Sequence, residues 1–447
     1  MPDNPQLCLA AQAASWKSAL VGDNTRQAVR HAILDWFATT LAGRQQRPAR
    51  LLLDVFQDQS TASGAICYID NSRKPPRTAA LLNATSSHIV EFDDIFRDGG
   101  YHPGSPTISA ALALAQYHDL SLDDLHRAII GGYEVGCRIS LAIQPSHYEY
   151  WHTTSTVGTI GAAVACALLL DCDVEVIAHA ISLATSFAGG HQQNLSDVGM
   201  AKALHAGHAA EAGMLAAFAA ARGMTGSVEA LHGRSGFAAA TSNSCGDWAA
   251  ALEGLGKWTP IERITVKNHG CCGHIFPSID GLRVLRAQAG FNNADISSIH
   301  VSGYGATKRM CDRSKPETAQ EARFSVQYCL AADLLLGNVR LRAFDDDALA
   351  NKEIRALMQV IAVEEDATLS DLYPRQRMAR IKVTLRDGRV FERLQETRKG
   401  DPEDPLGSVE IAAKFDELAG SVLSGAAATD LKQALLHGNE LPGPLIE

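Results

Sequence analysis

The chain has 447 residues, more than one hydrophobic core usually supports, so we expect two domains. Hydrophobic residues make up 46% and charged residues 20%, which is typical of a folded protein and excludes a largely disordered one. The formal net charge of −10 argues against binding to nucleic acid or to acidic membranes, but it allows a local basic pocket for an anionic ligand.

The N-terminal residues lack a basic start followed by an apolar run, so we expect no signal peptide and a cytoplasmic protein. Ten cysteines are scattered along the chain without a CxxC pair, which is typical of reduced thiols in a cytosol. The longest apolar run, residues 156–170, is too short to span a membrane and predicts a buried core helix.

The first part of the chain has the periodicity of helices. Apolar residues recur at spacings of three and four over residues 25–42 and 107–118. Residues 201–222 form the clearest helix, and its small residues, such as Ala206 and Gly213, indicate close packing on neighbouring helices.

The pattern changes near residue 261, where strands and helices begin to alternate. Asp387-Gly388 lies between two alternating runs and predicts a hairpin. We expect strands at 261–267, 295–303, 378–385 and 389–396, and helices at 277–289, 318–336 and 345–357.

Residues 408–436 return to a helical pattern. The sequence therefore predicts a mostly α protein, in which a large all-helical domain is built from residues 1–260 and 398–447. A smaller α+β lid domain, residues 261–397, is inserted into it. Such an insertion creates an interdomain cleft, which is a favoured place for a small-molecule site.

Ionisable residues are concentrated at the first candidate site. His88, Glu91, Asp93 and Asp94 fall within seven residues, and His102 follows after a glycine-rich loop. Helical spacing would place His88 and Glu91 on one face, where carboxylate and imidazole can shift each other's pKa and divide acid and base roles. A helix end with solvated acids is an equally good interpretation of these residues alone.

Two further segments combine histidines with hydroxyl or cationic groups. His152 precedes a run of Thr and Ser that can open a helix, whose free N–H groups attract carboxylates; plain capping explains the run as well. Lys202 begins the Ala-rich helix, with His205 and His208 after it at three-residue steps. A lysine beside a cleft can hold a carboxylate, although a lone lysine is more often a surface residue.

The fourth segment runs from Lys267 to His274 and contains Cys271 and Cys272. The density of His and Cys suggests zinc, but the spacing fits no standard arrangement, and we expect no metal site. A glycine-rich loop that presents Lys and His to a cleft is the better interpretation. Tyr328, at the start of a later helix, is either a phenolic acid or a core residue.

In this order, seven strings resemble the MmgE/PrpD family over nearly the whole chain. They are SSHIVEFDD with HPGSP, GYEVGCRI, HTTSTVGTIGAA, GMAKALHAGHAAEAG, VKNHGCCGHIFPSID, ARFSVQY and GDPEDPL. The resemblance implies a helical domain with a smaller α+β lid, a homodimer and no organic cofactor. It also implies a small di- or tricarboxylate substrate.

The resemblance places nine residues in the family's cleft. We expect catalytic roles for His102, Glu91, Lys202, Lys267 and Tyr328, and substrate binding by His152, Asp94, Cys272 and His274. His102 is the first choice for the proton-transferring base, because the ordinary pKa of an imidazole lies near neutrality. Glu91 would orient His102 or carry a second proton.

Departures from the family pattern bear on the reaction. Glu91 replaces the usual Asp, and Ile95 stands where dehydratases and decarboxylases often carry Thr. Because the hydroxyl contact is lost while the proton carriers remain, we expect an epimerase of the iminodisuccinate type. The alternatives are a 2-methylcitrate dehydratase-type hydro-lyase, a cis-aconitate decarboxylase-like enzyme, a metal-dependent hydrolase that uses His88, Glu91 and His102 or the 269–274 segment, and a noncatalytic dimeric interaction protein.

Overall fold

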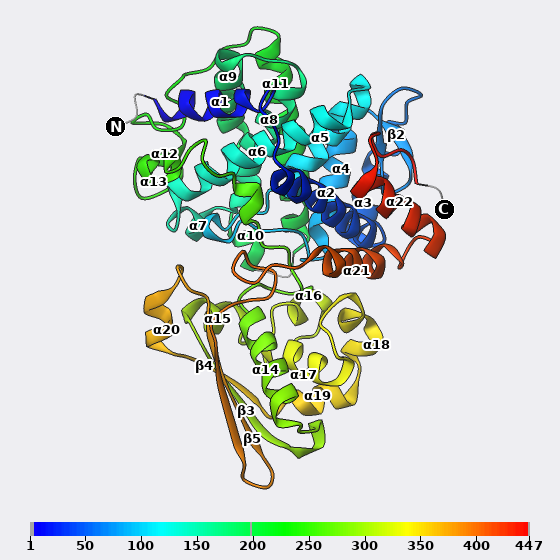
Figure 1. Cartoon of the computed structure of the whole chain (residues 1–447), viewed down its shortest axis with the longest axis vertical. Coiled ribbons are helices and arrows are strands. Elements are labelled where there is room, and N and C mark those ends of the chain that lie inside the picture. Colours follow the sequence, from blue (N-terminus) through cyan, green and yellow to red (C-terminus); the bar gives the residue numbers. More distant parts are fainter. Residues whose placement is uncertain (1–3, 197–198, 446–447) are drawn as a thin grey trace. The chain divides into compact units, whose positions relative to one another are not determined.

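The computed structural model describes residues 4–196 and 199–445 and divides into two compact units (Figure 1). Unit 1 comprises the chain up to Val266 together with the residues from Gly407 onward, and unit 2 comprises Lys267–Leu406. The molecule is mostly α, as expected. Among the described helices, none has the length and apolar character that crossing a membrane requires.

Among its described residues, unit 1 is helical apart from one small hairpin, β1 (Ala65–Cys67) with β2 (Ser72–Lys74). Its helices are α1 (Pro5–Ser15), α2 (Asp23–Gly43), α3 (Arg47–Val55), α4 (Pro76–Ile89), α5 (Gly104–His118), α6 (Leu122–Ile143), α7 (His147–Tyr150), α8 (Thr153–Leu169), α9 (Val174–Phe187), α10 (Gln193–Ser196), α11 (Ala201–Ala221), α12 (Phe237–Thr241), α13 (Trp248–Leu252), α21 (Ser408–Ala419) and α22 (Gly425–His437). The expected helices at 25–42, 107–118, 156–170 and 201–222 are confirmed.

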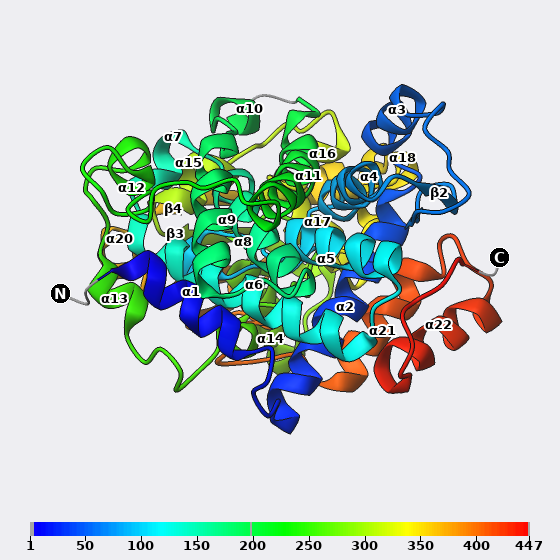
Figure 2. The ribbon, with the colours of Figure 1, turned by 90° about the horizontal axis from the view of Figure 1, so that it is seen from above.

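Helix α11 packs against α8 and α4, and α5 packs against α4 and α8, so that these helices lie side by side in unit 1 (Figure 2). Small residues permit the close approach, as expected for α11. A Cβ added at Gly213 would lie 2.5 Å from the carbonyl oxygen of Thr159 in α8, and one at Gly207 would lie 2.6 Å from the carbonyl oxygen of Leu81 in α4. The chemistry-bearing residues of α4, α8 and α11 are thereby brought together.

Unit 2 contains a four-stranded sheet in the order β4-β3-β5-β6, where β3 is Ile296–Gly303, β4 Ile361–Glu365, β5 Ala379–Leu385 and β6 Val390–Gln395. β3 pairs parallel to β4 and antiparallel to β5. Helix α14 (Phe276–Ala289) packs on β5 and β6, and the other helices are α15 (Gly305–Cys311), α16 (Ala319–Ala322), α17 (Val326–Leu336), α18 (Asp346–Leu349), α19 (Lys352–Met358) and α20 (Ala367–Leu372). The hairpin at Asp387-Gly388 is confirmed, with Gly388 at φ 89°.

The expected strand at 261–267 is wrong. Pro260–Arg263 form a short 3₁₀ helix, for which Pro260 supplies a suitable φ, and only Thr265 makes a bridge, to Ile95. The expected helices at 318–336 and 345–357 are each broken in two. Ser325 and Asn351 cap new helix starts with their side chains, a local preference that outweighs the apolar periodicity.

Candidate active site

The end of helix α4 sets the geometry of the first cluster. The helix ends at Ile89, and Glu91 adopts φ 55°, a left-handed conformation that is rare for residues other than glycine. The expectation that His88 and Glu91 share one helical face is therefore wrong, because the helix stops before Glu91. The loop that follows carries Asp93 and Asp94 into the interior, where they are 3% and 4% exposed.

Asp93 lies between two imidazoles. His88 Nδ1 is 2.7 Å from Asp93 Oδ2, and His102 Nδ1 is 3.3 Å from the same oxygen. Ser105 Oγ also donates to this oxygen at 3.0 Å, and Ser87 Oγ donates to Ser105 Oγ at 2.8 Å. All of these side chains are buried.

Burial by itself would raise the pKa of Asp93, but the charges of His88 and His102 and their hydrogen bonds hold it well below its ordinary value. Asp93 is thus a carboxylate that can only accept hydrogen bonds, so His88 donates its Nδ1 proton to it. A carboxylate beside Nδ1 of His102 favours the tautomer in which Nε2 carries the lone pair, which is the form of a general base.

His88, Asp93 and His102 also bring three potential ligand atoms within 4.8 Å of one another, the one such group found among the described residues. Two ligand atoms of one tetrahedral Zn²⁺ lie about 3.3 Å apart, given metal–ligand distances of about 2.0–2.1 Å. The 2.7 Å separation of His88 and Asp93 fits a hydrogen bond better. The metal-dependent alternative predicted from the sequence uses Glu91 together with His88 and His102. In the structure, the carboxylate close to these two histidines is that of Asp93.

Asp94 anchors the loop to two helices. Its Oδ1 accepts from the backbone N–H of Gly104 at 3.0 Å, at the start of α5, and its Oδ2 accepts from the Tyr133 hydroxyl of α6 at 2.7 Å. The pKa of Asp94 is raised to about 7, by burial first and then by the charges of Asp35 and Asp93, which together outweigh the lowering effect of the two hydrogen bonds. Both oxygens of this expected substrate ligand are therefore engaged within the protein.

A second pair of imidazoles lies beside the first. His152 precedes the first residue of α8, as expected, and its Nδ1 is 3.0 Å from Nδ1 of His205 on α11. Burial first, and then nearby positive charges such as His88, lower the pKa of His152 well below its ordinary value and that of His205 to about 4. The two rings are therefore neutral near pH 7, and in their contact one Nδ1 donates a proton to the other.

The four rings form a continuous row. Centroid distances are 5.1 Å between His102 and His88, 5.5 Å between His88 and His152, and 5.2 Å between His152 and His205. Ionised Asp93 contacts His102 and His88 at one end of the row, and the neutral pair of His152 and His205 forms the other end. Such an arrangement can both accept and donate a proton near neutral pH.

Lys202, near the start of α11, forms an ion pair with Glu91. The lysine side chain is 14% exposed, whereas the glutamate side chain is 4% exposed. The strained backbone at Glu91 and this ion pair lie next to the histidine row. A substrate carboxylate could take the place of the Glu91 carboxylate as a partner for the ammonium.

The remaining expected residues belong to unit 2. Lys267 and Cys272 are buried, and the backbone N–H of Cys272 donates to the Arg323 carbonyl at 2.9 Å. His274 Nδ1 lies 2.7 Å from the Tyr304 hydroxyl. Burial, followed by the charges of Arg377, Arg398, Arg309 and Lys267, lowers the pKa of His274 to about 3. Unit 2 thus has a locally cationic field around a neutral imidazole, although the whole chain is acidic.

Tyr328 lies in the core of unit 2. It is 0% exposed, and its hydroxyl donates to the Ala343 carbonyl at 2.6 Å. This placement matches the core interpretation of the sequence better than that of a phenolic acid. His269 is also buried, with Nε2 2.9 Å from Asp280 Oδ1, which helps to hold the loop of residues 268–274 against α14.

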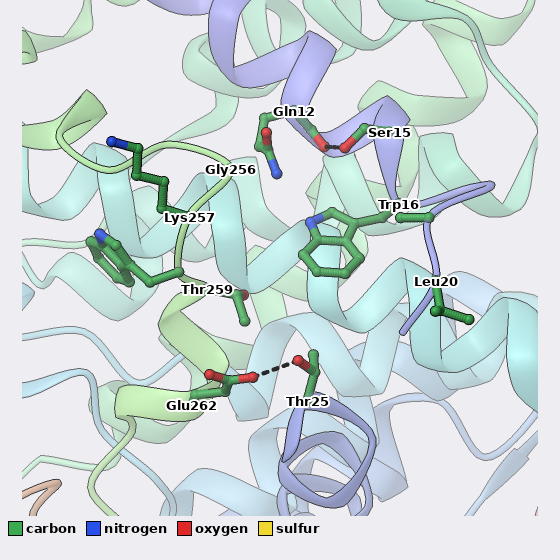
Figure 3. Close-up of a pocket in the computed structure, with 11 residues that line it drawn as sticks. Gln12, Ser15, Trp16, Leu20, Thr25, Gly256, Lys257, Thr259 and Glu262 are labelled. Carbon is green, nitrogen blue, oxygen red and sulfur yellow. Dashed lines mark hydrogen bonds between the residues drawn. The ribbon is translucent and has the colours of Figure 1, made fainter. Parts of the chain in front are cut away.

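A cavity of about 390 Å³ lies elsewhere in unit 1, between α1 and the segment of residues 256–262 (Figure 3). Its lining includes Trp16, Lys257 and Glu262, whose carboxylate accepts from Thr25, and no histidine is among the lining residues. The cavity therefore lacks the proton carriers that characterise the histidine row.

The first cluster in the sequence includes Asp93, but the sequence analysis predicts a catalytic role for Glu91 and substrate binding by Asp94. It also left out Tyr133, Ser105 and Tyr304, which hold site residues through their hydroxyls. The sequence signal for Tyr133 is the string GYEVGCRI, which contains it. The glycines of this string indicate close helix packing, and close packing brings the Tyr133 hydroxyl near the loop of Asp94.

Comparison with known proteins agrees with the order of these segments. Residues 8–246 match the family model described as the MmgE/PrpD N-terminal domain, and residues 269–437 match the MmgE/PrpD C-terminal domain. A cis-aconitate decarboxylase of Mus musculus is 27% identical over 379 residues, covering 81% of this chain and 76% of that protein. A cis-aconitate decarboxylase-like protein of Aspergillus oryzae is 26% identical over 463 residues, covering 97% and 95%. A cis-aconitate decarboxylase of Homo sapiens is 26% identical over 377 residues, covering 82% and 77%.

Proposed function

Because the chain belongs to the MmgE/PrpD family, we propose that it is an acid–base lyase acting on a small polycarboxylate, with decarboxylation of cis-aconitate as its leading reaction. The observation that carries the proposal is the ionised Asp93 between His88 and His102, next to the ion pair of Lys202. This arrangement supplies a proton carrier and a cation within unit 1.

Decarboxylation requires the electron pair of the breaking C–C bond to move into a conjugated system that ends on a carboxylate. The tricarboxylate then takes up one proton at carbon and leaves as a dicarboxylate and CO₂. Lys202 would stabilise the negative charge that develops on the conjugated carboxylate. His102, after taking a proton from solvent to become an imidazolium, would deliver that proton to carbon, and Asp93 would keep its ring oriented.

Our expectation from the sequence was epimerisation, and the comparisons favour the lyase alternative instead, because the relatives described above are named for cis-aconitate decarboxylation. Epimerisation is expected from the hydroxyl contact that is lost at Ile95. In the structure the backbone of Ile95 pairs with Thr265 through hydrogen bonds of 3.0 and 2.9 Å. The residue thus has a structural role that does not depend on the chemistry of its side chain.

Dehydration of a hydroxylated tricarboxylate is the second candidate. It needs a base for the α-proton and an acid for the leaving hydroxyl at the same time. The neutral pair of His152 and His205 supplies N–H groups that would hydrogen-bond to the leaving hydroxyl beside the base candidate His102, which makes this reaction the alternative.

The test is incubation of the purified protein with cis-aconitate and with 2-methylcitrate in D₂O, followed by NMR of the products and measurement of CO₂. We expect CO₂ and a deuterated unsaturated dicarboxylate from cis-aconitate. Water loss from 2-methylcitrate without CO₂ release would establish the second candidate. Inversion of a single stereoisomer of iminodisuccinate, with both tricarboxylates unchanged, would contradict the lyase proposal.

A further inference from the structure

A buried lysine on α21, the first helix after unit 2, contacts the loop that carries Asp93. Lys414 Nζ donates to the carbonyl oxygen of Phe92 at 2.7 Å and lies 4.3 Å from the centroid of the Phe92 ring. The same ammonium pairs with Asp35 Oδ1 of α2 at 2.6 Å. Lys414 and Asp35 are 0% and 2% exposed.

The ion pair with Asp35 explains why the Lys414 ammonium can be buried, but it does not explain the hydrogen bond to Phe92. Burying an ammonium costs several kcal/mol unless the group is paired and hydrogen-bonded, and Asp35 supplies the opposite charge. The hydrogen bond to Phe92 is a separate contact, made to the backbone. It connects a helix that follows unit 2 in the sequence to a loop more than 300 residues earlier, within the same unit.

The contacted carbonyl belongs to the peptide group that joins Phe92 to Asp93. Because a peptide group is planar, fixing its oxygen also fixes the direction in which the Asp93 nitrogen and Cα leave it. The loop begins at Glu91 in a strained left-handed conformation, which persists only where the surroundings hold it. Lys414 is one of the groups that hold this backbone.

Asp93 in turn sets the positions of the two imidazoles, since one of its oxygens lies within 3.3 Å of both His88 and His102. A shift of the Phe92–Asp93 peptide would move that oxygen relative to both rings. Catalytic geometry is sensitive to such shifts, because a displacement of about 1 Å can cost about 100-fold in rate.

We propose that Lys414 is a positioning residue. It holds the Phe92–Asp93 peptide in the position that places Asp93 Oδ2 beside Nδ1 of both His88 and His102. The proposal rests on the proposed function, because it assigns the effect of Lys414 to proton transfer through His102. Lys414 itself acts on the backbone and does not need to touch the substrate.

Two variants separate this role from that of a simple ion pair. Lys414→Met removes the ammonium that pairs with the buried Asp35 and leaves the carboxylate in place, whereas Asp35→Asn/Lys414→Met removes both charges. The matched control is Glu134→Gln/Arg138→Met, another fully buried ion pair of unit 1. The guanidinium of Arg138 donates to the carbonyls of Ala251, Glu253 and Trp258, none of which belongs to the loop that carries Asp93.

Urea unfolding, kcat, KM and crystal structures of the three variants form the test. We expect Asp35→Asn/Lys414→Met to recover most of the stability lost in Lys414→Met, while kcat stays about tenfold or more below wild type and KM changes less than threefold. The control pair should lose stability with unchanged kcat. In the crystal structure of the double variant, the 2.7 Å contact between His88 and Asp93 should be lengthened or lost.

A double variant with wild-type kcat and an unmoved Asp93 would overturn the positioning role and leave the proposed function intact. If the wild-type protein turns over none of the polycarboxylates, the proposed function fails instead. The crystal structure of the double variant then decides the positioning of Asp93 by itself: an unmoved carboxylate overturns the proposal, and a displaced one supports it.

Discussion

At the scale of single residues, the histidine row depends on one carboxylate. Asp93 accepts from His88 and Ser105 and lies 3.3 Å from His102, so that its charge affects both rings. A proton carrier held in this way keeps one tautomer and one orientation, and this distinguishes His102 from the exposed histidines of the chain.

His102→Ala should lower kcat for the preferred polycarboxylate about 100-fold or more, because the proton-transferring group is lost while the fold is kept. Steady-state kinetics and circular dichroism of the purified variant check this expectation. His118→Ala, at an exposed position in the last turn of α5, is the matched control and should keep wild-type kcat. Near-normal turnover by His102→Ala would remove this residue from the mechanism.

Asp94 should make the protein less stable as the pH rises from about 4 towards 7. Its pKa is raised from 3.8 to about 7, so between these values the folded state holds a proton that the unfolded state has released. Stability from this group is therefore present at low pH and falls, by at most about 1.4 kcal/mol per pH unit, until the pH passes about 7.

Asp94→Asn keeps the acceptor for Gly104 and a polar partner for Tyr133 but cannot ionise. The free energy of unfolding of wild type minus that of Asp94→Asn, measured in urea from pH 5 to pH 8, should decrease up to about pH 7 and then level off. Comparing the two proteins cancels groups such as His205, whose lowered pKa has the opposite effect on stability. A difference that does not change with pH would show that Asp94 is ionised throughout.

At the scale of elements, the site depends on how closely α11 approaches its neighbours. Gly213 leaves no room for a side chain, since an added Cβ would lie 2.5 Å from the carbonyl oxygen of Thr159. A backbone carbonyl cannot yield as the end of a flexible side chain can. Helix α11 would have to move, together with Lys202 and His205.

Gly213→Ala should therefore destabilise unit 1 by about 1–3 kcal/mol and lower kcat at the same time, because overpacking displaces the helix. Gly425→Ala is the matched control, since Gly425 opens α22 with nothing within 4 Å of an added Cβ. The control should be neutral or slightly stabilising. Chemical denaturation and kinetics of both variants measure the difference, and equal behaviour of the two would refute the packing argument.

Helices and strands with strong apolar periodicity could be predicted from the sequence. The residues at which helices begin could not, where a side-chain cap decides them. Helices α2, α8 and α11 agree with their apolar patterns, and the hairpin β5–β6 agrees with its Asp-Gly turn. The helix expected at 318–336 ignored Ser325, whose side chain starts a new helix. Periodicity reports burial, whereas a single side-chain hydrogen bond decides where a helix begins.

The candidate site was predictable as a set of segments but not as a set of contacts. The sequence strings identified His102, His152 and Lys202, which the structure places around one row of rings. The central position of Asp93 could not be foreseen, because it depends on where α4 ends and on the left-handed backbone at Glu91. Lys414 lies far along the chain, and only tertiary packing brings it to Phe92.

At the scale of the whole molecule, unit 1 is assembled from both ends of the chain. Helix α21 packs on α2, and Phe415 and Leu418 are 0% exposed. The ion pair of Lys414 with Asp35 crosses the same contact. Unit 1 therefore lacks part of its core until the residues after unit 2 have been added.

Truncation after Leu406 should abolish cooperative folding of unit 1, because it exposes the apolar face of α2 and removes the Lys414 ammonium that pairs with the buried Asp35. Truncation after Gly438 is the control. It keeps α21 and α22 and removes a tail that is tied down by hydrogen bonds such as those from Gln116 to Pro442 and from Asn71 to Leu445. Thermal unfolding followed by circular dichroism should show a cooperative transition for the control, at a lower Tm than the full chain. A cooperative transition in the shorter protein, with native-like helicity, would show that residues 407–438 are not needed for the core of unit 1.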